Sequence, residues 1–314
     1  MSDLSSMLEK PILVFGGAAL DAKARAIEPL VHGSSVPGQI RVSVGGVARN
    51  IAECLARLEV PTILFTAVGD DSLGEYILER TAHSGVDISP SLRVPAARTS
   101  AYLAMFEPEG PIAWAMDDMG ILAHLTPEVV SLQRHLIEGA RAVVLDNNLP
   151  LETMERIIQI AREAKVPICA DPTSRYLASR FVPFLPYFNF IAPNQQEAGV
   201  LCDCEIQSED DALKAAQQLV RRGVRMALIT MGDMGVIYAT TNESGHIRAP
   251  AVDILDPTGA SDAMTATVVY ALIHEFPVDE AVRLAVTAAM LTLTSQDTVR
   301  NDLSLELLYD SLVV

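Results

Sequence analysis

The chain has 314 residues, of which 50% are hydrophobic, and its formal net charge is −17. It can therefore bury a large core, whereas the acidic excess and the lack of basic clusters argue against a nucleic-acid partner. Because residues 1–10 lack the pattern of a secretion signal and no apolar run reaches membrane-spanning length, we expect a cytoplasmic protein with no membrane segment.

The first predicted elements end in polar or glycine residues. Residues 12–15 form an apolar run typical of a buried strand, and Asp21 follows just beyond its end. Residues 39–44 alternate between polar and apolar side chains, which predicts a half-exposed strand that stops at two glycines. A helix is expected to begin there, with Asn50 in its first turn, where this side chain either faces a ligand or caps the helix.

The next segments add a second kind of sheet. Residues 62–67 and 73–82 predict a strand and a crossover helix, as in a βαβ unit. Residues 98–116 alternate on both sides of a Glu-Pro-Glu-Gly turn, which predicts a β-hairpin. With the half-exposed strand before it, this hairpin would form a small sheet inserted in two pieces, at about residues 17–45 and 95–118. A flap over a ligand and a subunit contact are its two expected uses.

Polar residues follow two strands of the second half. Asn148 comes after a predicted strand at 142–145, and Asn194 and Glu197 come after one at 190–192. Open parallel sheets bind ligands at this edge. If a helix begins after Asn194, Asn194 and Glu197 share a face and could bind a hydrated Mg²⁺, and the alternative is an ordinary helix start. The other predicted elements are strands at 168–170 and 226–230 and helices at 151–164, 210–222, 279–294 and 303–312.

A glycine turn follows the strand at 226–230. Gly232 and Gly235 come directly after Thr230 and precede a further apolar strand. Glycines let the backbone pass close to a flat or phosphorylated ligand, although a plain hairpin turn has the same composition.

The segment 256–262, Asp-Pro-Thr-Gly-Ala-Ser-Asp, leads into an alanine-rich run that predicts a buried helix. The first N–H groups of a helix have no intrahelical partner and attract anions. Small residues there would let a phosphate approach these amides, and Asp262 could accept a proton from a hydroxyl that attacks the phosphate. The alternative is a loop with an aspartate that caps the helix.

The order of these motifs resembles that of the ribokinase-like (PfkB) carbohydrate kinase family. The run Gly-Gly-Val-Ala-Arg-Asn-Ile-Ala at 45–52 and the segment 256–262 carry the resemblance, which extends from about residue 12 to the last helix. It implies one α/β domain over residues 1–314, with a mostly parallel central sheet, helices on both of its faces and a small inserted β-sheet as a lid. Within the family, the runs at 117–119, 145–153 and 171–174 most resemble the pseudouridine kinases.

The resemblance implies an ATP-dependent kinase that phosphorylates the 5′-hydroxyl of pseudouridine. The implied catalytic residues are Asp262 as the base and Gly259, Ala260 and Ser261, whose amides would stabilise the transferring phosphoryl group. The implied cofactors are ATP and Mg²⁺, with Asn194, Thr230, Gly232 and Gly235 at the nucleotide and Glu197 binding Mg²⁺ through water. The implied substrate residues are Asp21, Gly45, Gly46 and Asn50, with Asn148 beside them. In some relatives the positions of Asp256 and Thr258 hold a monovalent cation, which makes K⁺ a further candidate.

Four positions depart from the family pattern and leave other functions open. Ser261 stands where glycine is usual, Ala19 where asparagine is common, Thr267 where a small residue is usual, and Leu177 where the pseudouridine kinases tend to have lysine. The alternatives are a kinase for another ribosyl nucleoside or a free sugar, and a binding protein that has lost efficient transfer through Ser261. The apolar residues of the expected lid, Phe106 and Trp114 among them, favour a homodimer formed through it.

Overall fold

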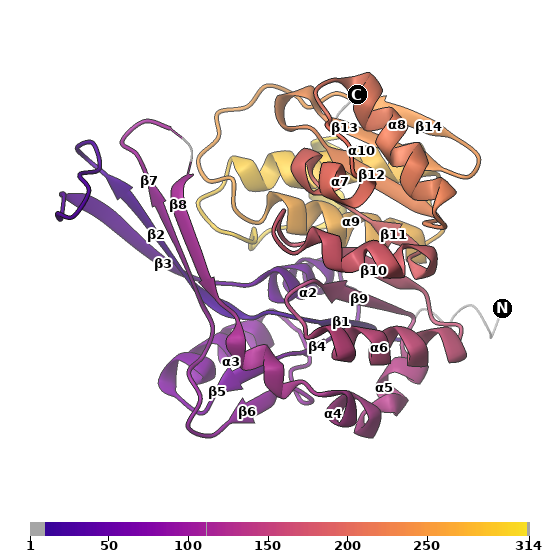
Figure 1. The fold of residues 1–314 in the computed structure, drawn as a ribbon, viewed down its shortest axis with the longest axis horizontal. Helices are drawn as coiled ribbons and strands as arrows, with labels where there is room; N and C mark the ends of the chain where they lie inside the picture. Colours follow the sequence, from indigo (N-terminus) through magenta and orange to yellow (C-terminus); the bar gives the residue numbers. More distant parts are fainter. Residues whose placement is uncertain (1–9, 111, 313–314) are drawn as a thin grey trace.

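The computed structural model describes residues 10–110 and 112–312, and in this part an eight-stranded sheet forms the centre of the body (Figure 1). Its order is β14-β13-β12-β11-β10-β9-β1-β4, and the strands from β12 to β4 run parallel, whereas β13 and β14 are antiparallel. The mostly parallel sheet expected from the sequence is therefore confirmed. The strands are β1 Ile12–Phe15, β4 Thr62–Phe65, β9 Ala142–Asp146, β10 Ile168–Asp171, β11 Phe190–Ile191, β12 Met226–Thr230, β13 Val236–Thr240 and β14 Ser244–Ile247.

Helices cover both faces of this sheet, also as expected. Alternate residues of β1 enter different cores: Leu13 and Phe15 pack in one, and Ile12 and Val14 in the other. A strand buried on both faces is apolar throughout, which explains the unbroken hydrophobic run. The first core is covered by α6 Leu151–Glu163, α7 Gln195–Cys202 and α8 Glu209–Arg221, and the second by α2 Val47–Arg57, α9 Ala260–Ile273 and α10 Val278–Leu293.

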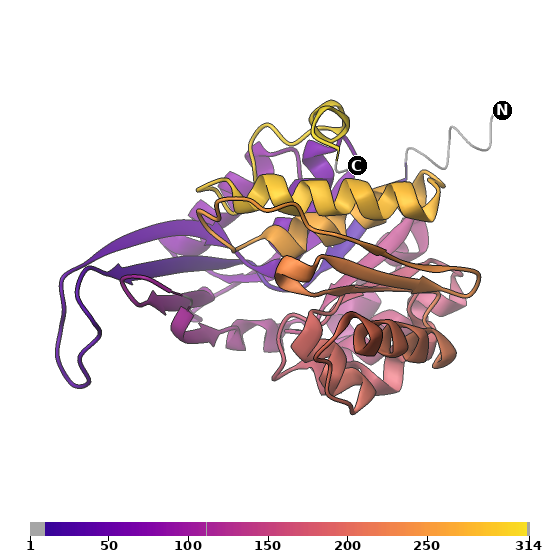
Figure 2. The same cartoon turned by 90° about the horizontal axis from the view of Figure 1, so that it is seen from above.

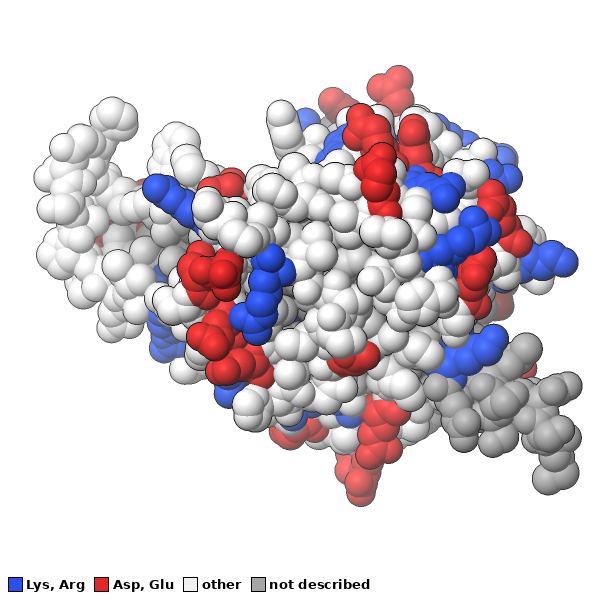
Figure 3. Space-filling model, turned by 90° about the horizontal axis from the view of Figure 1, so that it is seen from below, with Lys and Arg blue, Asp and Glu red and all other residues white. Residues whose placement is uncertain are grey.

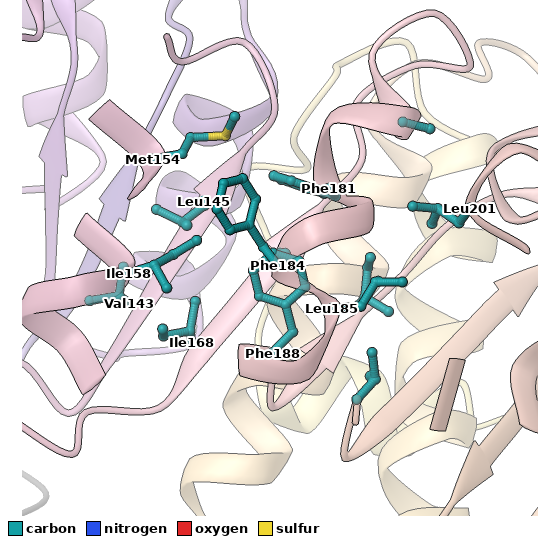
Figure 4. Packing of buried hydrophobic residues seen from close by; sticks show 14 of the residues in the cluster. Val143, Leu145, Met154, Ile158, Ile168, Phe181, Phe184, Leu185, Phe188 and Leu201 are labelled. Atoms are coloured by element: carbon teal, nitrogen blue, oxygen red, sulfur yellow. The ribbon is translucent and has the colours of Figure 1, made fainter. Parts of the chain in front are cut away.

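A segment that the sequence did not predict closes the first core. The 3₁₀ helix η2, Ala178–Tyr187, contains Pro183 and Pro186, each of which lacks an N–H group for an α-helical ladder. Phe181 and Phe184 of this helix pack in the first core with Leu145 of β9 and Ile158 of α6 (Figure 4). The rings of Phe181 and Phe188 meet edge to face at 5.0 Å between centroids. This packing fixes the chain just after β10, next to the carboxyl edge of the sheet.

A four-stranded sheet, called the small sheet below, projects from the body (Figures 1 and 2). Its order is β3-β2-β7-β8, so it is built from two separate pieces of chain, as expected. Asp21, which follows just beyond β1, lies inside β2, because the chain re-enters an extended conformation within three residues of Gly16. The strands are β2 Ala19–Ala26, β3 Gly38–Gly45, β7 Ala101–Phe106 and β8 Ile112–Asp118.

The predicted strand at 62–67 also differs from the structure. The chain leaves the central sheet after Phe65, and β5, Ala67–Gly69, pairs instead with β6, Leu92–Val94. The backbone N–H of Leu92 donates to the carbonyl of Thr66, at 2.8 Å, where the two sheets separate. The remaining elements are α3 Ser72–His83, η1 Gly120–His124, α4 Pro127–Leu132, α5 Arg134–Gly139, η3 Gly232–Met234 and α11 Leu305–Asp310. Over the described residues we find no helix of the length and apolarity that crossing a membrane requires.

The two faces of the small sheet have opposite chemistry. On the face toward the body, the strand register places Ser43, Asp21, Tyr102 and Asp117 in one row across all four strands. Asp21 in this row is only 4% exposed. The outer face is apolar although it is exposed, with Ile40 at 72%, Val42 at 59%, Leu103 at 44%, Trp114 at 71% and Met116 at 73%.

Candidate active site

Helix α9 begins with a turn that only glycine fits well. Its N-cap residue, Gly259, has φ 85°, and a Cβ at this position would overlap the carbonyl oxygen of Thr298. The amides that follow lie in the first turn, where backbone N–H groups lack intrahelical acceptors. Ser261 has a helical, unstrained backbone and an exposed side chain, so the change from the usual glycine leaves the helix start intact.

Asp262 lies buried in the same turn and is held by α2. Its Oδ2 accepts a hydrogen bond of 2.6 Å from Nδ2 of Asn50. The Oδ1 atom of Asn50 in turn accepts from Nε of Arg49, at 3.1 Å, and also from its Nη2. Arg49 therefore fixes which end of the Asn50 amide faces Asp262. Its own Nη1 donates to Glu53 at 2.7 Å, one turn farther along the helix.

The surroundings of Asp262 favour a proton acceptor that works near neutral pH. Burial, together with the charge of Asp171, raises the pKa of Asp262 to about 8, while Asn50 and Arg49 oppose this change. Burial likewise raises the pKa of Asp171 to about 6 and, with the Asp171 charge, that of Glu197 to about 7. A general base is most effective when its pKa is near the working pH. Perturbed carboxyl groups brought together in this way are typical of a functional site.

An apolar cavity of about 250 Å³ opens at the start of α9. It brings the expected nucleotide residues Thr230, Gly232 and Gly235 together with Ala260 and Ser261 of the helix start. Its remaining walls are apolar, which suits the flat ring of a nucleobase. These walls are formed by Val236, Ala249, Pro250, Val252, Pro257, Met264, Val286, Ala289, Met290 and Leu293.

Asn194 and Glu197 form a capping box at the start of α7. The Oδ1 atom of Asn194 accepts hydrogen bonds of 2.9 Å from the amides of Gln196 and Glu197, and Oε2 of Glu197 accepts one of 2.8 Å from the Asn194 amide. Asn194 also lies beside Thr230 in an isolated parallel bridge, which places it next to the cavity. The second oxygen of Glu197 is the one that a hydrated Mg²⁺ would use. No described residues form a cluster of three or more potential metal ligands, so phosphate and water oxygens would complete the ligand set.

The residues expected at the sugar converge on the chain between β1 and β2. A Cβ on Gly45 would overlap the carboxyl group of Asp21, and one on Gly46 would overlap the Gly17 carbonyl. The Nδ2 atom of Asn148 would lie 3.4 Å from a Cβ on Gly17. Glycines at these positions therefore let Asp21 and Asn148 lie directly against the backbone, at the inner edge of the small sheet.

Asp146, the last residue of β9, organises this region. It is fully buried and accepts hydrogen bonds from the amides of Gly17, Asn148 and Ala48 at 2.7, 2.9 and 3.3 Å. One carboxyl group thus ties β1, β9 and the start of α2 together. Its three amide partners are far apart in the chain, so no local sequence signal could have identified this role.

Asp256 has both carboxylate oxygens engaged. Oδ1 accepts from the Thr258 amide at 2.9 Å, and Oδ2 forms an ion pair of 2.8 Å with Nζ of Lys23 from β2. Lys23 also donates to Oγ1 of Thr298 at 3.4 Å. Lys23 was not predicted as a site residue because β2 was not recognised as a strand. Once it is, the period of two places Lys23 on the same face as Asp21.

The hydrogen bonds that link Arg49, Asn50 and Asp262 lead to a prediction about how activity depends on pH. As a general base, Asp262 would have to be deprotonated, so kcat/KM of a reaction that uses it is expected to fall as the pH decreases through its raised pKa. An Arg49→Met variant removes a positive charge that lowers this pKa and frees the Asn50 amide, which raises the pKa further. We therefore expect the fall in kcat/KM to move to higher pH, as measured by pH profiles of the wild type and variant.

Two variants serve as controls for this prediction. Arg49→Lys keeps the charge, so its shift should be smaller. Arg57→Met removes another partner of Glu53, at 3.2 Å, that is not bonded to Asn50, so its profile should match that of the wild type. A profile for Arg49→Met that coincides with the wild type would show that Arg49 does not influence the base.

Comparison with known proteins gives a consistent family match. Residues 10–304 match the family model described as pfkB family carbohydrate kinase. The chain is 32% identical over 295 residues to pseudouridine kinase from Escherichia coli (strain K12), covering 94% of each protein. It is 28% identical over 267 residues to ribokinase from Haemophilus influenzae, covering 84% of this chain and 86% of that protein. A carbohydrate kinase structure from Agrobacterium tumefaciens superimposes with a TM-score of 0.81 at 27% identity, over 97% of this chain and 98% of that one.

Proposed function

We propose that this chain, which belongs to the pfkB family of carbohydrate kinases and is an ATP-dependent sugar or nucleoside kinase, phosphorylates the 5′-hydroxyl of pseudouridine. The observation that carries the proposal is the position of Asp262. This buried carboxyl group with a raised pKa lies in the first turn of α9, next to a cavity that contains the residues expected at ATP.

The proposed reaction uses each of these features in turn. The adenine ring occupies the apolar cavity, and the triphosphate extends toward the first turn of α9. Asp262 accepts the proton of the 5′-hydroxyl as its oxygen attacks the γ-phosphorus, and the bond from that phosphorus to the β,γ-bridging oxygen breaks to release ADP. The amides at Gly259, Ala260 and Ser261 stabilise the negative charge on the transferring phosphoryl group.

Mg²⁺ is the metal that the family implies, and the residues present fit it. When bound, it screens the charge of the phosphate oxygens. Glu197 has one carboxylate oxygen outside the capping box and is the residue proposed to hold the hydrated ion.

The small sheet supplies the proposed sugar contacts and the lid. Asp21 lies in the polar row that crosses its inner face, and its carboxylate is suited to accept hydrogen bonds from ribose hydroxyls. Tyr102 and Asp117, in the same row, are the proposed contacts for the polar edge of the base. A sheet closed over these groups would exclude water and so prevent ATP hydrolysis.

A substrate panel distinguishes pseudouridine from the alternatives. The relatives include a ribokinase and a pseudouridine kinase, so the panel contains pseudouridine, uridine, inosine, guanosine, adenosine and ribose, each with ATP and Mg²⁺. We expect pseudouridine to have the highest kcat/KM. A higher value for ribose or another nucleoside would reject the proposed substrate.

Binding without turnover for every compound would instead favour the non-catalytic alternative. In that case, recovery of turnover in Ser261→Gly would identify the side chain at the helix start as the cause. Failure of this variant to recover turnover would place the cause elsewhere in the site.

The outer face of the small sheet is the proposed contact for a second copy of this chain. In Figure 3 the sheet, at the left, carries few charged side chains on the side shown. An exposed apolar face of this kind marks an association site. In a chain with net charge −17, the nearly uncharged face is where two copies can approach with least repulsion.

Charged substitutions on this face should separate the dimer. Trp114→Asp combined with Met116→Glu places two carboxylates where the side chains are 71% and 73% exposed, so the fold of one subunit should be preserved. We expect sedimentation equilibrium to give a dimer for the wild type and a monomer for this variant. A matched pair of exposed side chains on two other helices, Leu132→Asp on α4 with Tyr309→Glu on α11, should stay dimeric. A monomeric wild type would contradict the proposal.

A further inference from the structure

We infer that the ammonium group of Lys23 is the resident cation of the loop before α9, in place of the exchangeable monovalent cation expected at Asp256 and Thr258. Lys23 is therefore a positioning residue that links the small sheet to the helix start. The inference deepens the proposed function and rests on it for its consequence on phosphoryl transfer.

The geometry around Asp256 does not fit an exchangeable ion. Such an ion needs several free oxygen ligands, whereas the two Asp256 oxygens already accept from the Thr258 amide and from Lys23 Nζ. A second positive charge at this carboxylate would also be repelled by the ammonium group at close range. The residues present thus supply the cation themselves.

The ion pair is shielded from solvent. The Lys23 side chain is 9% exposed and that of Asp256 is 16% exposed, and the nitrogen to oxygen distance is 2.8 Å. Burial alone would raise the pKa of Asp256, but the bonds from Lys23 and Thr258 outweigh it and hold the pKa below its ordinary value. A buried pair is strongly disrupted when one partner is removed, because the other charge is left unpaired.

Lys23 contacts both sides of the turn that starts α9. On one side it binds Asp256, which accepts from the Thr258 amide next to Gly259. On the other it donates to the hydroxyl of Thr298, whose carbonyl oxygen lies against the α-carbon of Gly259. The ammonium group therefore holds the two segments between which Gly259 adopts its positive φ. Because Lys23 belongs to β2, this support depends on the position of the small sheet.

A Lys23→Met variant should create a site for an exchangeable cation at the position that the ammonium group occupies in the wild type. It keeps most of the aliphatic side chain and leaves the carboxylate and hydroxyl around an unfilled space. We expect the thermal midpoint of the variant to rise in KCl or NH₄Cl relative to choline chloride at equal ionic strength, because a ligand that binds only the folded state stabilises it. The wild type should show no such difference between the salts. This measurement requires no kinase activity.

Activity provides the second measurement. In choline chloride we expect kcat of Lys23→Met to be about 10-fold or more below that of the wild type, because an electrostatic support of the transition state is lost. Added NH₄⁺ or K⁺ should restore part of kcat, and this effect should saturate with the cation concentration. The control is Arg41→Met, which removes a positive charge from the residue paired with Lys23 on β3. Arg41 forms no ion pair among the described residues, so its kcat and its response to salts should match those of the wild type.

The outcomes separate this inference from the proposed function. A wild type that is stabilised or activated specifically by K⁺ would overturn it, as would a Lys23→Met variant that has no cation-specific response. If the wild type phosphorylates no compound while the thermal midpoints behave as expected, the proposed function fails and the resident cation stands.

Discussion

Asp262→Asn is expected to lower kcat by about 10²–10⁴-fold, the usual contribution of a positioned general base. The change preserves the size of the side chain and an oxygen that can accept the hydrogen bond from Asn50, which is 2.6 Å long in the native protein. It removes only the ability to accept a proton from the attacking hydroxyl. ATP binding should therefore be retained, which titration calorimetry checks, while steady-state kinetics measure the loss in kcat.

The matched control for this substitution is Asp253→Asn. Asp253 is an exposed carboxylate on the loop before α9, nine positions earlier, and it neither lines the cavity nor takes part in the Asp256 ion pair. We expect it to have the kcat of the wild type. A rate for Asp262→Asn within a few-fold of the wild type would remove the proposed base from the mechanism.

Gly259→Ala is expected to be nearly as damaging, for a geometric reason. The φ of 85° strains any residue with a Cβ, at a cost of about 1–3 kcal/mol, and this Cβ would also overlap the Thr298 carbonyl. The turn must move, and with it the amides that are proposed to stabilise the phosphoryl group. We expect kcat to fall about 100-fold, similar to the loss of an oxyanion donor, together with a lower free energy of unfolding.

Substitutions at two other glycines distinguish the effect of backbone strain from the effect of moving the turn before α9. Gly33→Ala has a similar φ of 76° with no atom within 4 Å of the new Cβ, so it should reduce stability and leave kcat unchanged. Gly139→Ala, at the end of α5, has neither the strained φ nor a close contact, so it should leave kcat unchanged and should not lower the free energy of unfolding. If Gly259→Ala retains the kcat of the wild type, the position of the helix start does not control transfer.

The parts of the fold that the sequence predicted are those with a local physical cause. The run at 12–15 is apolar because β1 is buried on both faces. The alternation at 39–44 predicted a strand but not its environment, because the apolar Ile40 and Val42 lie on the exposed outer face of the small sheet. The start of α9 was predicted within one residue, since glycine and proline before Ala260 are incompatible with a helix. Asp262 in the first turn followed from this boundary.

Contacts between distant segments could not be predicted in the same way. Asn50 and Asp262 are 212 positions apart, and Lys23 and Asp256 are 233 apart. The first pair depends on the packing of α2 against α9 and the second on the position of the small sheet, and local periodicity contains neither. β2 was missed because its middle has an inverted pattern: the polar side chains of Asp21 and Lys23 are buried, while Ala22 and Ala24 are half-exposed.

The most direct test of the account identifies the product formed from pseudouridine, ATP and Mg²⁺ by the wild-type protein. We expect phosphorus and proton NMR to show one product, phosphorylated at the 5′-oxygen, together with one equivalent of ADP. A phosphate on another hydroxyl, or release of ADP and inorganic phosphate without a phosphorylated nucleoside, would contradict the account.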